Sequence, residues 1–253
     1  MSGGWTARAE HLPEVMDDPR CDPVGLERTY AAFDTVNRVV SGWRPVYTRD
    51  LRPWLIRPGG ATLLDIGCGG GDVARHLARW ARRDGLKLRI TAIDADARAI
   101  AYATEQPPEP GVTYRQALSG DLRTEGQHFD LVISNHLLHH LSGPELTALL
   151  ADTEALCTGL AVHGDIERHP LAYAVFRAAT ARTFPGSFIH VDGLRSIRRS
   201  YTHAELAAVA PPGWAARRQF PFRNLLTWHS GEPKANPSGA RMSNRPDRGD
   251  GRA

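Results

Sequence analysis

The stretch "LLDIGCGGGD", residues 63–72, decides the fold. Its apolar first half is typical of a buried strand, and its glycines permit a tight turn in which backbone N–H groups approach a ligand. The segment that follows, "DVARHLARWARR" (72–83), has the apolar spacing of an amphipathic helix. A strand, a glycine loop and a helix in this order predict the first unit of a layered α/β sheet.

Strand-like and helix-like segments alternate along the rest of the chain. Further strands are expected at 86–94, 112–118, 129–136, 159–166, 214–222 and 224–229. Helices are expected at 95–105, 144–156 and 170–182. An aromatic loop at 184–193 follows the last of these helices. We therefore predict an α/β fold: a doubly wound, mostly parallel, seven-stranded Rossmann-like sheet closed by an antiparallel hairpin.

The chain divides into three predicted parts. Residues 1–57 form an N-terminal arm and a two-helix lid, because Asp22-Pro23 has the form of a helix cap and two amphipathic runs follow it. Residues 58–230 form the core, with a cap insertion at 168–202 after the fifth strand. Residues 231–253 are rich in Gly, Pro, Ser and Arg, and this composition predicts a disordered tail.

The charge and cysteine content exclude several classes of protein. Among 253 residues, 31 Lys and Arg face 28 Asp and Glu, and five of these bases lie in the last 23 residues. The last 23 residues also hold three of the acidic residues, so residues 1–230 carry 26 basic and 25 acidic side chains. This near balance of charge lacks the basic excess of a nucleic-acid binder. Three cysteines without a CxxC pair, and no apolar N-terminal run, predict a cytoplasmic protein without stable membrane insertion. We also expect a monomer or homodimer that acts on a small molecule.

Two carboxylates indicate which ligand the glycine loop holds. Gly69-x-Gly71-x-x-Ala74 fits a dinucleotide fingerprint, so a nicotinamide or flavin enzyme is an alternative. Asp65, however, ends the first strand, where a carboxylate is unfavourable beside a pyrophosphate but suits a ligand with an ammonium and a sulfonium group. Asp94 ends the second strand and is placed to accept hydrogen bonds from a ribose diol.

This D-x-G-x-G-x-G pattern with the later Asp94 resembles the S-adenosylmethionine (SAM) site of class I, seven-stranded methyltransferases. The resemblance implies SAM as cofactor, bound by a set of residues at the strand ends: Asp65, Gly67, Cys68, Gly69, Gly71, Asp94, Ala95, Ala117, Leu118 and Asn135. One departure is that many relatives carry an acidic residue after the third strand, where this chain has Ala117 and Leu118.

Three histidines follow the fourth strand in "SNHLLHHL", residues 134–141. A zinc site would need a helix here, and Ser142 with Glu145 has the form of a capping box, so the helix is expected to start later; we predict no metal. The "LHH" with an Asp after strand five is similar to some sugar and phenol O-methyltransferases. By that resemblance His139 is the general base, Asp165 orients it, and His140 is the substitute.

The additions to the core supply the predicted acceptor pocket. Its candidate lining residues are Tyr30, Phe33, Trp43, Tyr47, His136, Tyr173, Phe176, Phe188 and His190. "RAEHLPEVMDDP" (8–19) and "RRSYTHAEL" (198–206) also resemble actinobacterial methyltransferases found with type III polyketide synthases. That resemblance implies O-methylation of a small phenolic or lipid-like acceptor. C-methylation of a quinol ring, as in ubiquinone and menaquinone pathways, and a non-catalytic binding role are the alternatives.

Overall fold

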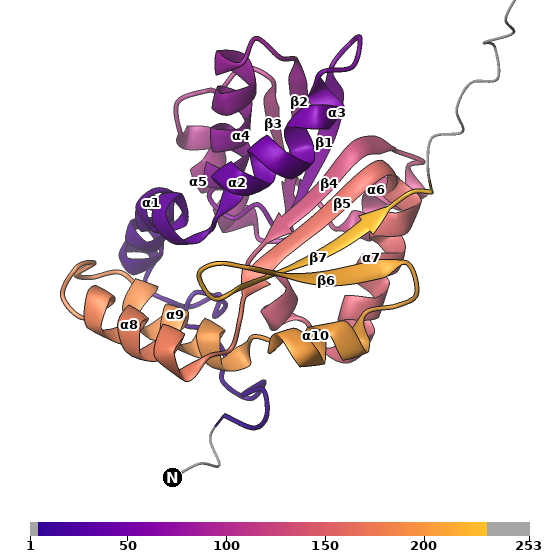
Figure 1. Cartoon of the computed structure of the whole chain (residues 1–253). Coiled ribbons are helices and arrows are strands. Elements are labelled where there is room, and N and C mark those ends of the chain that lie inside the picture. Colours follow the sequence, from indigo (N-terminus) through magenta and orange to yellow (C-terminus); the bar gives the residue numbers. More distant parts are fainter. Residues whose placement is uncertain (1–4, 232–253) are drawn as a thin grey trace, which may run out of the picture.

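The computed structural model describes residues 5–231, in which seven strands form one sheet flanked by helices (Figure 1). The strand order is β3-β2-β1-β4-β5-β7-β6. The strands are β1 Ala61–Ile66, β2 Leu88–Asp94, β3 Val112–Gln116, β4 Phe129–Asn135, β5 Cys157–Ile166, β6 Trp214–Gln219 and β7 Arg223–His229. The first five pair in parallel, and β7 runs antiparallel to β5 and β6. The predicted α/β fold is confirmed as a mixed seven-stranded sheet.

Both faces of the sheet are buried, which explains why its strands read as continuous apolar runs. Leu63 of β1 packs in the core on one face, and its neighbours Leu64 and Ile66 pack in the core on the other. The first face is covered by α4 (Asp72–Arg83) and α5 (Ala97–Glu105). The second is covered by α6 (Ser119–Thr124), α7 (Gly143–Leu156) and α10 (His203–Val209).

The N-terminal segment differs from the predicted two-helix lid. Its first helix, α1 (Pro23–Val40), begins at the expected cap, where Asp22 accepts a hydrogen bond from the Gly25 N–H at 2.8 Å. The second run splits into α2 (Trp43–Val46), the π-helical turn η1 (Tyr47–Leu51) and α3 (Arg52–Leu55). These short pieces lie on the sheet rather than over the site, because their apolar side chains complete the core beneath α4.

The cap insertion consists of two helices, α8 (Pro170–Thr180) and α9 (Ile189–Arg199), which pack against each other. The predicted aromatic loop is a loop only as far as Phe188. Its continuation is helical because Ile189, Asp192, Ser196 and Ile197 recur at helical spacing and are buried. Two of these four residues are polar, so the apolar pattern alone does not reveal this helix.

The N-terminal arm, residues 5–22, lies along α9 and is fastened to it. The Ala9 N–H donates to the Arg198 carbonyl at 3.0 Å. Asp192 of α9 accepts from the Val15 and Met16 N–H groups at 2.7 and 3.0 Å. The arm, α1, α8 and α9 therefore gather beyond one end of the sheet (Figure 1).

The sheet order reverses between β1 and β4, and ligands of such sheets bind outside the carboxyl ends of the strands at this point. The tail predicted at 231–253 lies outside the described residues except for Gly231. Within residues 5–231, no helix combines the length and the apolar character needed to cross a membrane.

Candidate active site

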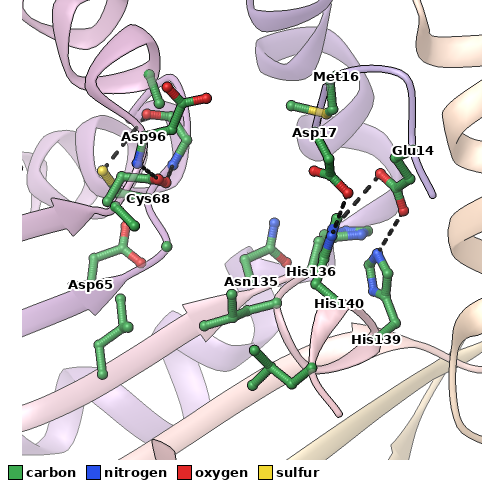
Figure 2. Close-up of a pocket in the computed structure, with 18 of the residues that line it drawn as sticks. Glu14, Met16, Asp17, Asp65, Cys68, Asp96, Asn135, His136, His139 and His140 are labelled. Atoms are coloured by element: carbon green, nitrogen blue, oxygen red, sulfur yellow. Dashed lines mark hydrogen bonds and ion pairs between the residues drawn. The ribbon is translucent and has the colours of Figure 1, made fainter. Parts of the chain in front are cut away.

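A cavity of about 720 Å³ opens at the carboxyl ends of β1, β2 and β4. Figure 2 shows its two ends: Asp65 and Cys68 lie on one side, and Glu14, Asp17, His139 and His140 lie on the other, with Asn135 between them. Both groups line the same cavity. A ligand that spans it would contact the glycine loop at one end and the histidines at the other.

The glycine loop curls tightly between β1 and α4. The N–H groups of Gly67 and Cys68 both donate to the Ile93 carbonyl, and the Gly69 N–H donates to Asp94 Oδ2 at 2.8 Å. Gly69 has a φ of +52° and faces open space, whereas a side chain at Gly71 would collide with the Tyr114 ring. Gly67, Cys68 and Gly69 line the cavity, and Gly71 supports the loop from behind.

Three carboxylates, Asp65, Asp72 and Asp94, make this end of the cavity acidic. Asp65 is only 1% exposed, and neither of its oxygens has a hydrogen-bond partner among residues 5–231. Burial, reinforced by Asp72 and Asp94, raises the pKa of Asp65 well above its ordinary value. Burial also raises the pKa of Asp94, although the N–H groups of Gly69 and Asp96 oppose this. The set favours a cationic ligand.

The wall beyond Asp94 is formed by the residues predicted for the adenine side. Ala95, Ala117 and Leu118 all line the cavity. Leu118 is 61% exposed, and its N–H donates to Asp121 Oδ2 at 2.9 Å. Asp121 lines the same wall and is the acidic residue that this region offers in place of the one absent after the third strand.

A buried arginine fixes the two residues at the end of β4. Arg223 of β7 donates to Asn135 Oδ1 and to His136 Nε2, both at 2.9 Å. His136 has a φ of +57°, an uncommon backbone conformation for a residue other than glycine. Burial, followed by the Arg223 charge, lowers the pKa of His136 well below its ordinary value. His136 is therefore a neutral imidazole at the cavity wall.

His139 meets Asp165 as the sequence analysis expected, but it meets a second carboxylate as well. Its Nδ1 lies 2.7 Å from Asp165 Oδ1, and its Nε2 lies 3.2 Å from Glu14 Oε1. Burial alone would lower the pKa of His139, and the two carboxylates outweigh it and raise the pKa to about 9. Burial would raise the pKa of Asp165, and the contact with His139 reverses this shift.

His140 repeats this arrangement with other carboxylates. Its Nε2 lies 3.7 Å from Glu14 Oε2, and its Nδ1 lies 3.3 Å from Asp17 Oδ2. Both rings therefore direct Nε2 toward Glu14 (Figure 2). Glu14 and Asp17 are not among the predicted site residues, although both lie in the arm segment "RAEHLPEVMDDP".

The structure separates the predicted acceptor residues into two groups. Tyr30, Phe33, His136 and Phe176 line the cavity. The remaining predicted acceptor residues are absent from its lining: Trp43, Tyr47, Tyr173, Phe188 and His190.

Local packing explains these corrections. Trp43 and Tyr47 are buried in the core of the sheet, and the Tyr47 hydroxyl donates to Asp84. Tyr173 packs edge-on against Trp5, and Phe188 packs beneath α1 against Gly25. His190 shares a hydrogen bond with the Thr180 hydroxyl at 2.8 Å. Aromatic composition could not distinguish these contacts from pocket positions.

Comparisons with known proteins agree with this geometry. Residues 63–159 match the Methyltransf_25 family model, which describes a methyltransferase domain. A ubiquinone biosynthesis O-methyltransferase of Cereibacter sphaeroides is 34% identical over 119 residues, which cover 46% of this chain and 45% of that protein. One from Caulobacter vibrioides is 39% identical over 88 residues, 34% of this chain and 32% of that protein. The chain thus matches about half or less of the length of these relatives.

Two solved structures share the fold. Human N-acetylserotonin methyltransferase in complex with SAM has a TM-score of 0.57 at 15% identity, with 83% of this chain and 57% of that chain covered. The plantazolicin methyltransferase BpumL in complex with a triazolic desmethylPZN analog and S-adenosylhomocysteine (SAH) also has a TM-score of 0.57, at 11% identity, with 81% of this chain and 96% of that chain covered. The chain therefore shares a Rossmann-like fold with these structures, and its residues 63–159 match a methyltransferase domain.

Proposed function

We propose that this protein is a SAM-dependent O-methyltransferase that acts on the hydroxyl of a small phenolic acceptor. The observation that carries the proposal is that one cavity joins the glycine-loop end and the histidine end of the site. The first end holds Asp65, which is buried without a hydrogen-bond partner among residues 5–231, and the second holds a polar cluster of Glu14, His139 and His140. A methyl donor and an acceptor hydroxyl need such neighbouring sites.

The charges at the first end favour SAM over a dinucleotide. A pyrophosphate would lie against three carboxylates, Asp65, Asp72 and Asp94, which would repel it. SAM carries an ammonium that Asp65 can pair with and a ribose diol that Asp94 can accept hydrogen bonds from. The exposed face of Gly69 allows the backbone to approach the ligand closely.

The second end suits an aromatic ring with a hydroxyl. Phe33, Phe176 and Ile189 give its wall apolar and aromatic surface, on which a ring packs favourably. Asn135 and His136 add polar groups at the edge nearest the methyl donor. An alkylresorcinol or a related quinol lipid fits this combination, and the curated relatives are named ubiquinone biosynthesis O-methyltransferases.

The proposed reaction is an in-line displacement. The acceptor oxygen attacks the methyl carbon, the carbon–sulfur bond breaks with its electron pair passing to sulfur, and SAH and an aryl methyl ether form. The hydroxyl proton must leave, and the polar cluster is where we expect its loss. His139 alone is a poor candidate for a free base, because each of its ring nitrogens faces a carboxylate.

Incubation with methyl-labelled SAM and a panel of catechols, alkylresorcinols and quinols tests this function. We expect label on a phenolic oxygen, located by NMR of the product. Label on a ring carbon would instead identify a C-methyltransferase. A parallel thermal-shift comparison should show stabilisation by SAH and none by NAD, and the opposite result would refute the cofactor assignment.

A further inference from the structure

We propose that Glu14, His139 and His140 bind a divalent metal ion of the zinc class at the acceptor end of the cavity. The inference rests on the proposed function for its role but not for its geometry. One ligand atom from each residue lies within 4.8 Å of the others. All three residues line the cavity, so an ion held by them would face the acceptor.

The spacing of the ligand atoms fits a tetrahedral ion. Zinc takes His nitrogen and carboxylate oxygen at about 2.0–2.2 Å, which sets neighbouring ligand atoms roughly 3.3–3.6 Å apart. Glu14 Oε1 lies 3.2 Å from His139 Nε2, Glu14 Oε2 lies 3.7 Å from His140 Nε2, and one ligand atom from each of the three residues lies within 4.8 Å of the others. Figure 2 shows both imidazoles directed at this one carboxylate. Two histidines and one carboxylate leave a fourth position open, as catalytic zinc sites do.

Each histidine is also held from behind by a carboxylate. Asp165 Oδ1 lies 2.7 Å from Nδ1 of His139, and Asp17 Oδ2 lies 3.3 Å from Nδ1 of His140. Metal-bound histidines characteristically donate their other N–H to such a partner, which fixes the ring and turns the free nitrogen toward the ion. Asp165 and Asp17 are therefore positioning residues, and the pattern occurs twice around Glu14.

His139 Nε2 gives a second indication, because it contacts Glu14 without forming a hydrogen bond to it. Its ring is 1% exposed, and Nε2 makes no hydrogen bond to any of residues 5–231, because its contact with Glu14 has the distance but not the alignment of one. A buried polar nitrogen without a partner is costly. A metal ion between Nε2 and Glu14 would satisfy it.

The arm holds Glu14 in place for this role. The Ser196 hydroxyl donates to Glu14 Oε1 at 2.7 Å, and Asp192 fixes the next two backbone N–H groups. Glu14 is 4% exposed although it belongs to an irregular segment. These contacts preorganise the third ligand, which a local sequence pattern around the histidines cannot reveal.

A bound ion would replace a free histidine base. The acceptor oxygen would occupy the open position and lose its proton to water as the metal–oxygen bond forms. The phenolate would then attack the methyl carbon, and the carbon–sulfur electron pair would pass to sulfur as before. The ion supplies the positive charge that stabilises the phenolate, so no free base has to remain beside it.

Metal binding to the full chain tests the site directly. After dialysis against a chelator, we expect one equivalent of Zn²⁺ by calorimetry and a visible Co²⁺ spectrum of tetrahedral form. Asp17→Asn should weaken Zn²⁺ binding by about 10–100-fold, and Glu14→Gln at least as much. The matched controls Glu10→Gln and His11→Ala change exposed residues of the same arm and should leave binding unchanged.

Glu14→Gln is the main variant because it keeps the side-chain shape, and its SAH affinity reports whether it remains folded. Equal Zn²⁺ affinity in wild-type protein and folded Glu14→Gln would overturn the site, as would no binding by the wild type. Full methylation of a phenol by the chelated enzyme would refute the catalytic role of the ion while leaving the proposed function intact. One-site Zn²⁺ binding without methylation of any phenol would refute the proposed function but support the site.

Discussion

Replacing Asp65 with asparagine should stabilise the ligand-free protein and nearly abolish cofactor binding. Asp65 is buried without a hydrogen-bond partner among residues 5–231, and burial raises its pKa well above the ordinary value. Because the folded state holds the Asp65 proton more tightly than the unfolded chain, this group destabilises the fold as pH rises above its unfolded pKa. Asparagine keeps the shape and removes the charge.

The structure sets the size of both effects. Each pKa unit by which folding raises the Asp65 pKa costs about 1.4 kcal/mol of stability at a pH above that pKa, and each kcal/mol relieved raises the melting temperature by about 2–4 °C in a chain of this length. Loss of a buried charge pair with the cofactor ammonium costs about 2–5 kcal/mol, which weakens binding by about 30-fold or more. Stability and binding should therefore change in opposite directions.

Thermal unfolding at pH 7 and calorimetry with SAH measure the two effects. Asp130→Asn is the matched control, because Asp130 accepts hydrogen bonds from the N–H and hydroxyl of Thr62 at the opposite end of the sheet. That variant should melt at a lower temperature and bind SAH like the wild type. A lower melting temperature of Asp65→Asn, together with wild-type SAH affinity, would refute the reasoning.

Three further predictions concern the loop, the core and the acceptor wall. Gly71→Ala should destabilise the fold measurably in thermal unfolding, because its methyl group would lie 2.5 Å from the Tyr114 ring at a φ of +75°. Tyr47→Phe should cost about 1 kcal/mol in denaturant unfolding through the lost bond to Asp84, with kcat and KM unchanged; a raised acceptor KM would restore Tyr47 to the pocket. Phe33→Ala should raise the acceptor KM about 2–10-fold with unchanged SAH affinity, and equal loss of both would contradict its place in the acceptor wall.

The fold could be predicted because its signals are local. Buried strands, the capping residues Asp22 and Ser142 and the glycine loop each act within a few residues, and all reappear in the structure. The segments that the sequence analysis described wrongly depend on tertiary contacts. The sequence of residues 43–55 predicts an amphipathic lid, but in the fold their apolar side chains pack into the core of the sheet. The buried face of α9 includes the polar residues Asp192 and Ser196, so an apolar pattern does not reveal it.

The same distinction separates the two ends of the cavity. The ends of two adjacent strands and the loop between β1 and α4 carry Asp65, Gly67, Gly69 and Asp94. Their spacing in the sequence predicts that they lie close together, and all four line the same cavity. The acceptor end is assembled from distant segments. The pair of His139 with Asp165 could be expected because β4 and β5 are neighbours in the sheet, whereas Glu14 arrives on an arm whose path no local pattern specifies.

This assembly also limits what relatives can indicate about the acceptor. The family match covers residues 63–159, which include Asp65, Asp94 and both histidines of the cluster but not Glu14. Glu14 is instead positioned by Ser196 of the cap, and Asp192 holds the backbone beside it. The segment that matches the family model therefore contains the glycine loop, while the proposed acceptor end is completed only when the arm lies on α9. Under the proposed function, a change in the arm or the cap would alter which hydroxyl is methylated and leave the cofactor end intact.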